Sequence, residues 1–220
     1  MINLSDLAAR ISKTGKSKNA REKSAGYHII RNKIYHCAGA TNPGLHLVSG
    51  ADPLSFEALS ENLARDCGHV YFAHKPLSDD PDHFVEIDQH LSKDSQHVFY
   101  ADRIISDDAP NFQLIEKIDS LTYCKDKHSI FVNGARCEGP DVTSFEPLQH
   151  GYARDCINVY LMGHASFKTI EGADPDSFQV INQYCSFDKK HVYWRGLRLT
   201  DCEPSTYEAL NGKHFPVKGL

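Results

Sequence analysis

The sequence repeats itself about every 30 residues, and this period limits the chain to architectures built from stacked copies of one small unit. Each copy has an aspartate, three mostly polar residues, a β-branched residue and an aromatic residue. The five copies are RDCGHVYF (65–72), KDSQHVFY (93–100), KDKHSIFV (125–132), RDCINVYL (154–161) and FDKKHVYW (187–194). Their aspartates are Asp66, Asp94, Asp126, Asp155 and Asp188, and a weaker copy without the aspartate occupies residues 30–36. A unit of this size buries too little apolar surface alone, so the copies are expected to stack.

A second element alternates with the first and places an acidic residue four positions before an aromatic residue. The acids are Asp52, Asp80, Asp108, Asp141, Asp174 and Glu203, and the aromatics are Phe56, Phe84, Phe112, Phe145, Phe178 and Tyr207. Aspartate followed by proline is typical of a helix start, because the carboxylate accepts hydrogen bonds from the first amides and proline presets φ. An aliphatic residue three positions after each aromatic would share its helix face.

These patterns together predict a fold. Helices are expected over roughly residues 53–64, 81–92, 109–121, 142–152, 175–185 and 204–210, with Pro147 shortening or kinking the fourth. The Val-Tyr segments predict buried strands, followed by tight turns such as Asn133-Gly134 and Arg195-Gly196. The expected fold class is α+β, with about six strand–turn–strand–helix units of about 30 residues stacked into one elongated or curved repeat domain over residues 27–220. Residues 1–26 are expected to form a short helix and a basic flexible linker.

The segments KDSQHVFY, FDKKHVYW, SFEAL and ADPDSF resemble the bacterial DKNYY repeat family, which is named for an Asp-Lys-Asn-Tyr-Tyr motif. FDKKHVYW is nearest to that motif, because Asp188-Lys189 is followed after two residues by Val192-Tyr193. The resemblance spans roughly residues 27–210, and the middle of the motif varies after Asp126 and Asp155. It implies no established activity, but some proteins of this kind resemble immunity proteins that are encoded beside polymorphic toxins.

The net charge of −5 is distributed unevenly. Residues 1–33 hold eight basic and two acidic residues, or +6, so the remainder carries −11. A broadly basic nucleic-acid-binding protein is therefore not expected, and the basic arm is interpreted as a solvated tail rather than a contact for nucleic acid or lipid. No apolar run reaches the roughly 18 residues of a membrane span, and no secretory signal is recognised. Seven cysteines without close pairs favour free thiols and a cytoplasmic location.

The repeated polar residues are interpreted as structural. Aspartate before a strand stabilises a turn through its own backbone, and five copies of a turn are more natural than five active sites. One motif position holds His69, His97 and His191 but Ser129 and Asn158 in the other copies, which does not suit a metal site. Nucleophile-elbow and phosphate-loop motifs are absent, although only geometry can exclude a hidden Cys-His pair. No catalytic residue, metal ligand or cofactor is therefore expected.

The acidic stretch 79–119 goes beyond a scaffold, since it holds eleven acids and three basic residues. One interpretation is solubility and helix capping, and the other is contact with a basic protein partner, because complementary charge speeds encounter and fixes register. The candidate partner-binding residues are Asp79, Asp80, Asp82, Glu86, Asp107 and Asp108.

The resulting hypothesis is a non-enzymatic immunity protein that occludes the active site of a cognate bacterial toxin. Toxins that act on nucleic acids often carry a basic cleft for phosphate, which an acidic inhibitor would fit. Nucleic acid and membranes are not expected as partners. Two alternatives remain open at this point: a hydrolase that reverses a toxin's modification, and a general repeat scaffold or ligand-binding protein without a toxin partner.

Overall fold

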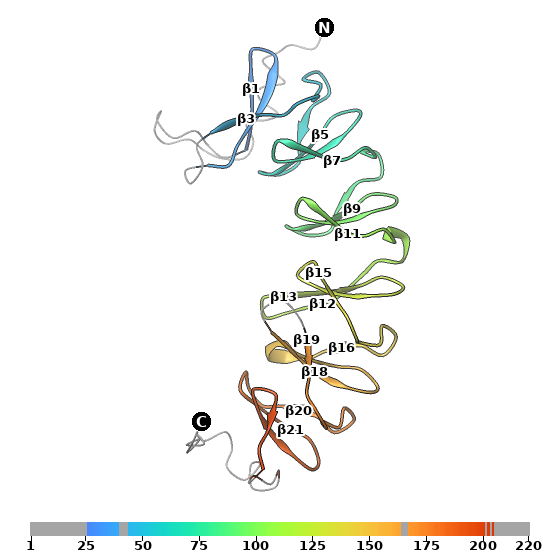
Figure 1. The fold of residues 1–220 in the computed structure, drawn as a ribbon. Helices are drawn as coiled ribbons and strands as arrows, with labels where there is room; N and C mark the ends of the chain where they lie inside the picture. Colours follow the sequence, from blue (N-terminus) through green and yellow to red (C-terminus); the bar gives the residue numbers. More distant parts are fainter. Residues whose placement is uncertain (1–25, 40–43, 164–166, 201, 203, 205–220) are drawn as a thin grey trace. The chain divides into compact units, whose positions relative to one another are not determined.

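The computed structural model describes residues 26–39, 44–163, 167–200, 202 and 204 (Figure 1). The chain divides into two compact units, Met1–Ala109 and Pro110–Leu220, and each is described by itself. The short helix and linker predicted before residue 26, and Tyr207 with nearly all of the last predicted helix, lie outside the described residues.

The first unit contains three small antiparallel sheets, in which consecutive strands are hydrogen-bonded neighbours. The first sheet consists of β1 (Gly26–Ile30), β2 (Lys33–Cys37) and β3 (Leu45–Leu47). The second consists of β4 (Glu57–Ala58), β5 (Leu63–Arg65), β6 (Val70–Phe72) and β7 (Lys75–Ser78). The third consists of β8 (Val85–Glu86), β9 (Leu91–Lys93), β10 (Val98–Tyr100) and β11 (Arg103–Ser106).

The second unit contains three four-stranded sheets of the same kind. They consist of β12 (Gln113–Ile118), β13 (Leu121–Lys125), β14 (Ile130–Val132) and β15 (Ala135–Cys137); of β16 (Glu146–Pro147), β17 (Tyr152–Arg154), β18 (Val159–Met162) and β19 (Phe167–Thr169); and of β20 (Gln179–Val180), β21 (Cys185–Phe187), β22 (Val192–Trp194) and β23 (Leu197–Arg198). Two short 3₁₀ turns are η1 (Ala109–Asn111) and η2 (Gln149–Gly151).

The predicted α+β fold class is wrong, because the structure is all-β and residues 26–39, 44–163 and 167–200 contain no α-helix. Each of the first five segments predicted as helices holds turns and short strands instead. Asp52 begins a β-turn, in which the Ser55 amide donates to the Asp52 carbonyl at 3.3 Å, and the chain then extends into β4. The expected helix face does not form, since Phe56 is 4% exposed and Leu59 is 37% exposed.

The strands predicted at the Val-Tyr segments are confirmed as β6, β10, β14, β18 and β22. The tight turns at Asn133-Gly134 and Arg195-Gly196 are also present, with positive φ at all four residues. Pro147 lies in β16, an edge strand of its sheet, where a missing amide breaks no ladder. The pattern therefore located the strands correctly and failed only between them.

The apolar core lies between neighbouring sheets of a unit. The ring of Phe178, which follows an Asp-Pro turn, has its centroid 5.8 Å from that of Tyr152 on β17 and 6.0 Å from that of Tyr193 on β22. Val159 and Ile170 complete this buried cluster. Burial of one such ring contributes roughly 1.5–3 kcal/mol, so Phe178 is a main contact between these two sheets.

The turn between β10 and β11 holds Ala101 at a φ of 54°, a left-handed conformation that disfavours a side chain by about 1–2 kcal/mol. Glycine lacks this penalty but gives the unfolded chain more freedom. We expect Ala101→Gly to raise the free energy of unfolding by up to about 1 kcal/mol in urea denaturation. The control Ala135→Gly, in β15 and without positive φ, is expected to lower it. Equal losses in both variants would show that Ala101 is not strained.

The Tyr123 hydroxyl is buried without a hydrogen-bond partner among the described residues. Burial raises the pKa of Tyr123 to about 12, above the value of about 10 for an unfolded tyrosine. The stability linked to the neutral phenol is therefore complete below about pH 10 and is lost as the pH rises towards 12. We expect Tyr123→Phe to keep or raise Tm at neutral pH and to lessen this alkaline loss. Thermal melts at neutral pH and between about pH 10 and 12 test this expectation. A clear fall in Tm at neutral pH would contradict it.

Candidate functional site

The motif aspartate closes the turn that precedes the motif strand. Oδ1 of the buried Asp155 accepts hydrogen bonds from the amides of Ile157 and Asn158 at 2.8 and 2.7 Å. Oδ2 accepts from the Asp141 amide at 2.8 Å and from the Tyr160 hydroxyl at 2.7 Å. Four donors surround one carboxylate, so its buried charge is compensated within the fold.

Asp66 and Asp188 repeat this arrangement. Each accepts hydrogen bonds from three amides, and the hydroxyls of Tyr71 and Tyr193 each donate to the Oδ2 atom at 2.8 Å. Burial by itself would raise the pKa of these carboxyls. The amide and tyrosine hydrogen bonds outweigh burial, so the pKa of Asp66, Asp155 and Asp188 is lowered. These charged groups hold turns in place.

The motif copy at Asp126 has a similar turn, in which Oδ1 accepts from the His128 amide at 2.8 Å. The histidines of the other copies lie beside their aspartates. Nδ1 of His69, His97 and His191 is 4.0, 3.6 and 3.7 Å from the Oδ1 atom of the respective aspartate.

The acid of the second repeated element lies in a turn next to the motif aspartate. The Ser144 hydroxyl donates to the Asp141 carboxylate at 2.7 Å and accepts from the Cys156 amide at 3.1 Å. Ser55 and Ser177 make the same two contacts in their own repeats. This acid was predicted to cap a helix, and the structure corrects that: it caps a turn that leads into a strand.

Asp94 is held by a different set of hydroxyls. Its motif aromatic is Phe99, which has no hydroxyl, and the Ser78 hydroxyl donates to Asp94 Oδ2 at 2.6 Å instead. Ser78 also accepts from the Asp80 amide at 3.1 Å. At Asp66, Asp155 and Asp188 the amide of the turn acid donates directly to the motif aspartate, whereas here a serine hydroxyl bridges the two groups. The Ser95 hydroxyl donates to the Asp80 carboxylate. At Asp52, Asp141 and Asp174 the donor to the equivalent carboxylate is the serine of the turn itself.

The sequence carries the same alternation through all five complete repeats. Where the motif aromatic is tyrosine, glycine lies two positions before the turn acid, and where it is phenylalanine, serine lies there. The pairs are Gly50 with Tyr71, Ser78 with Phe99, Ser106 with Phe131, Gly139 with Tyr160 and Gly172 with Tyr193. The three glycines have φ of 84°, 108° and 74°, a region that strains a serine. At Asp66, Asp94, Asp155 and Asp188 one hydroxyl donates to the motif aspartate, from one side or the other.

Sequence reasoning missed a second turn inside three of the segments that were predicted as helices. Asp88 Oδ1 accepts from the amides of His90 and Leu91, both at 2.8 Å. Asn182 accepts from the two equivalent amides, and the Ser60 hydroxyl accepts from the amide three residues on. A short polar residue six positions before the motif aspartate is the signal that would have located this turn, because such side chains bond to their own backbone.

The structure separates the six predicted partner-binding acids into two groups. Asp80 belongs to its turn, and hydrogen bonds from Ser95 and then His83 lower its pKa to about 2. Asp108 lies in the next turn, where its amide donates to the Ser106 hydroxyl at 3.1 Å. The exposed acids are Asp79, Asp82, Glu86 and Asp107.

Asp79 lines a cavity of about 220 Å³ in the first unit, here named the first-unit cavity, to which the sheets β4–β7 and β8–β11 both contribute. Its apolar lining is Pro76, Leu77, Phe99 and Ile104, and its other polar lining is His69, Ser78, Asp94 and His97. His97 Nε2 lies 3.9 Å from Asp107 Oδ1. Asp79 and Asp107 are 28 residues apart and each precedes a turn acid. One repeat position thus places one exposed acid in the cavity lining and another beside His97, which also lines the cavity.

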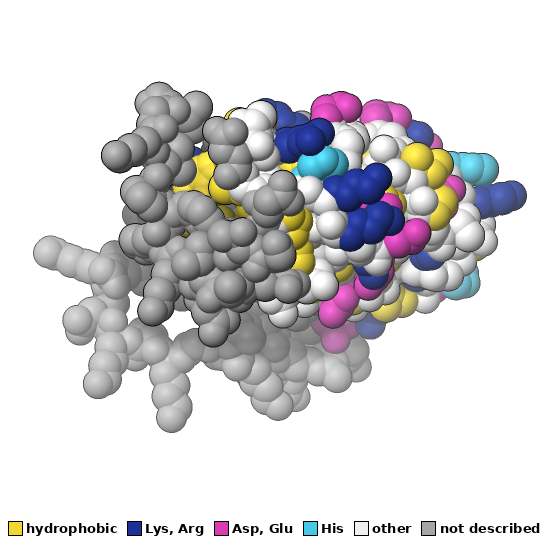
Figure 2. Space-filling model, turned by 90° about the horizontal axis from the view of Figure 1, so that it is seen from below, with side chains coloured by type: hydrophobic (Ala, Val, Ile, Leu, Met, Phe, Trp, Pro, Cys, Tyr) yellow, Lys and Arg dark blue, Asp and Glu magenta, His cyan; other side chains and the backbone are white. Residues whose placement is uncertain are grey.

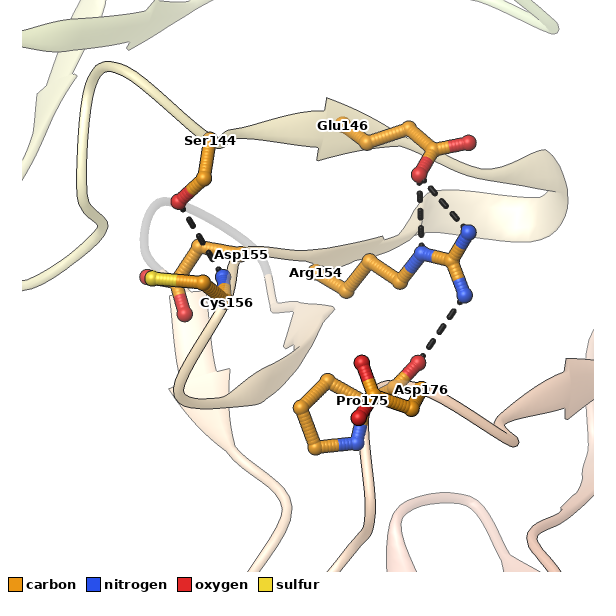
Figure 3. A pocket seen from close by; sticks show the side chains of 7 residues that line it. All are labelled: Ser144, Glu146, Arg154, Asp155, Cys156, Pro175 and Asp176. Carbon is orange, nitrogen blue, oxygen red and sulfur yellow. Dashed lines mark hydrogen bonds and ion pairs between the residues drawn. The ribbon is translucent and has the colours of Figure 1, made fainter.

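A second cavity, of about 240 Å³, lies in the second unit (Figure 3). Figure 3 shows the Arg154 side chain between Glu146 and the backbone of Pro175. Nε donates to Glu146 Oε2 at 2.8 Å, and Nη1 donates to the Pro175 carbonyl at 2.9 Å. Lys93 donates to the Ala109 carbonyl at 3.2 Å in the corresponding way. In these two repeats the basic residue before the motif aspartate therefore joins its sheet to the turn of the next repeat.

Lys and Arg side chains are interspersed with Asp and Glu on the face in Figure 2, and no charge of one sign covers the described part of it. Among the residues that the structure describes, no group of three or more His, Cys, Asp or Glu is arranged to hold a metal ion. None of the described segments is a helix with the length and apolar character needed to span a membrane. All seven cysteines are free thiols.

The fold and its turns define a repeat protein in which small antiparallel sheets are connected by hydrogen-bonded aspartate turns. The DKNYY family model matches residues 27–163, 78–193 and 152–218, so the family domain is repeated across the chain. The chain belongs to the DKNYY family, and the resemblance seen in the motifs is confirmed at this level. Neither a curated protein nor a solved structure matches the chain.

Proposed function

We propose that this protein is a non-enzymatic protein-binding module that neutralises a cognate bacterial toxin by occluding its active site. The observation that carries the proposal is the first-unit cavity, where Asp79, an acid that the turns do not use, lines the wall together with apolar side chains, and Asp107 lies beside the lining residue His97. Protein interfaces combine an apolar centre with polar groups that set orientation, and this cavity offers both to a partner with a basic cleft.

The distribution of the acids supports the same conclusion. The carboxylates of Asp66, Asp155 and Asp188 are buried and fully engaged, so they add little to a binding surface. Asp79, Asp82, Glu86 and Asp107 remain exposed in one stretch of the first unit. Exposed charges of one sign accelerate association with an oppositely charged partner, and the effect falls as salt rises.

The test is co-expression with the product of the neighbouring gene, followed by affinity purification and a growth assay. We expect a stable complex and restored growth, with full rescue only when this protein is at least equimolar with the toxin. Absence of both complex and rescue would refute the toxin partner. Full rescue at a small fraction of the toxin's concentration would instead indicate an enzyme that reverses the toxin's modification.

A further inference from the structure

We propose that the first-unit cavity receives a single arginine side chain from the partner. The partner's identity rests on the proposed function, whereas the chemistry of the cavity rests on its own residues. At about 220 Å³ the cavity is smaller than the roughly 300–1,000 Å³ that is usual for small-molecule pockets, so it suits one side chain rather than a cofactor.

The apolar wall fits the stem of a long basic side chain. Pro76, Leu77 and Ile104 line the cavity, and Ile104 is 55% exposed although it is aliphatic. The methylene groups of arginine and lysine pack against such surfaces while their charged ends remain near polar groups. The imidazoles of His69 and His97 lie in the same wall, and a planar guanidinium stacks on flat rings as a compact ammonium does not.

The charges of the cavity select a cation. Asp94 is buried in its lining, but Ser78 and the amides of Gln96 and His97 already donate to its two oxygens. Asp94 therefore contributes negative charge to the cavity, while both of its oxygens already accept hydrogen bonds within the fold. Asp107 is 85% exposed at its side chain, and its only described contact to His97 is 3.9 Å long, so this carboxylate can accept from a guanidinium.

The arrangement is confined to one place among the five complete repeats. The position before the turn acid holds Ala51, Asp79, Asp107, Pro140 and Ala173. This position is acidic only at Asp79 and Asp107. Asp79 lines the cavity, and Asp107 lies beside His97, which also lines it. Neither Lys nor Arg is among the described residues that line the cavity.

The test is an NMR titration of the full chain with N-acetyl-arginine amide, using N-acetyl-citrulline amide as the neutral isostere. We expect arginine to shift the His97 imidazole and Ile104 methyl signals saturably, with a Kd on the order of millimolar, and citrulline to leave them unchanged. Asp79→Asn with Asp107→Asn should abolish the shifts. The matched control, Asp82→Asn with Glu86→Gln, should retain them, because these exposed acids do not line the cavity.

Two outcomes overturn the assignment: equal shifts with citrulline, or tighter binding of N-acetyl-lysine amide than of the arginine probe. The same variants separate this inference from the proposed function. If a toxin complex forms and Asp79→Asn with Asp107→Asn leaves its Kd unchanged, the arginine site is overturned and the binding function stands. If the arginine probe binds but the neighbouring gene product does not, the site stands and the toxin partner is overturned.

Discussion

Asp155→Ala is expected to lower the free energy of unfolding by about 3–5 kcal/mol. The change removes the acceptor for three amides and for the Tyr160 hydroxyl, at distances of 2.7–2.8 Å. Hydrogen bonds to a charged group contribute about 1.5–3 kcal/mol each, and the amides that reach water recover part of the loss. Urea denaturation followed by circular dichroism measures the difference.

Two further variants make this expectation specific. Tyr160→Phe removes one of the four donors and should lower the free energy of unfolding by about 1–1.5 kcal/mol. Asp176→Ala changes an exposed acid of the neighbouring turn and should alter it by less than about 0.5 kcal/mol. If Tyr160→Phe destabilised the protein as much as Asp155→Ala, the carboxylate would not be the centre of the network.

The pH dependence provides an independent measurement. The pKa of Asp155 in the folded protein is lowered, so its stabilising effect is complete above the unfolded value of about 3.9 and is lost as the pH falls towards the folded value. Asp66 and Asp188 behave in the same way. Asp155→Ala should therefore reduce the loss of stability below about pH 4, while leaving the contributions of the other two repeats.

Much of this fold was predictable, because a period of about 30 residues is visible without a structure and its apolar strands are short and β-branched. The absence of helices between these strands was not predictable, because Asp52-Pro53 begins a β-turn as readily as a helix. Phe56 and Leu59 are three residues apart, which matches helical periodicity and also matches a strand between two turns. Ser60 marked the second turn, but a single polar residue also fits the solvent face of a helix.

The candidate site was predictable only in part. The acidic stretch drew attention to Asp79 and Asp107, and both are exposed. Their neighbours in the sequence, Asp80 and Asp108, have the same residue type but belong to turns, a difference that depends on a hydroxyl at Ser95 or Ser106. Composition alone cannot separate adjacent aspartates. The cavity also needs side chains from two sheets, whose packing no local pattern describes.

Exchange of the hydroxyl donor at Asp94 tests whether the alternation of Gly-Tyr and Ser-Phe repeats reflects one interchangeable contact. Ser78→Gly removes the hydroxyl that links the Asp80 amide to Asp94, and we expect a loss of about 2–3 kcal/mol in the free energy of unfolding. Phe99→Tyr alone should change it by less than about 1 kcal/mol, because the acceptor is already bound. The double variant recreates the Gly50-Tyr71 pair, in which the Tyr71 hydroxyl donates at 2.8 Å.

A double-mutant cycle gives the decisive quantity. We expect Phe99→Tyr to recover at least half of the loss caused by Ser78→Gly, with a coupling energy of at least about 1 kcal/mol. Glycine also increases the freedom of the unfolded chain, so Ser78→Ala, alone and with Phe99→Tyr, separates the hydroxyl from the backbone effect. Recovery with glycine but not with alanine would mean that the turn needs positive φ before its amide reaches the carboxylate directly, as at Gly50, Gly139 and Gly172. Strict additivity in both cycles would contradict interchange, because the two hydroxyls would then act at independent places.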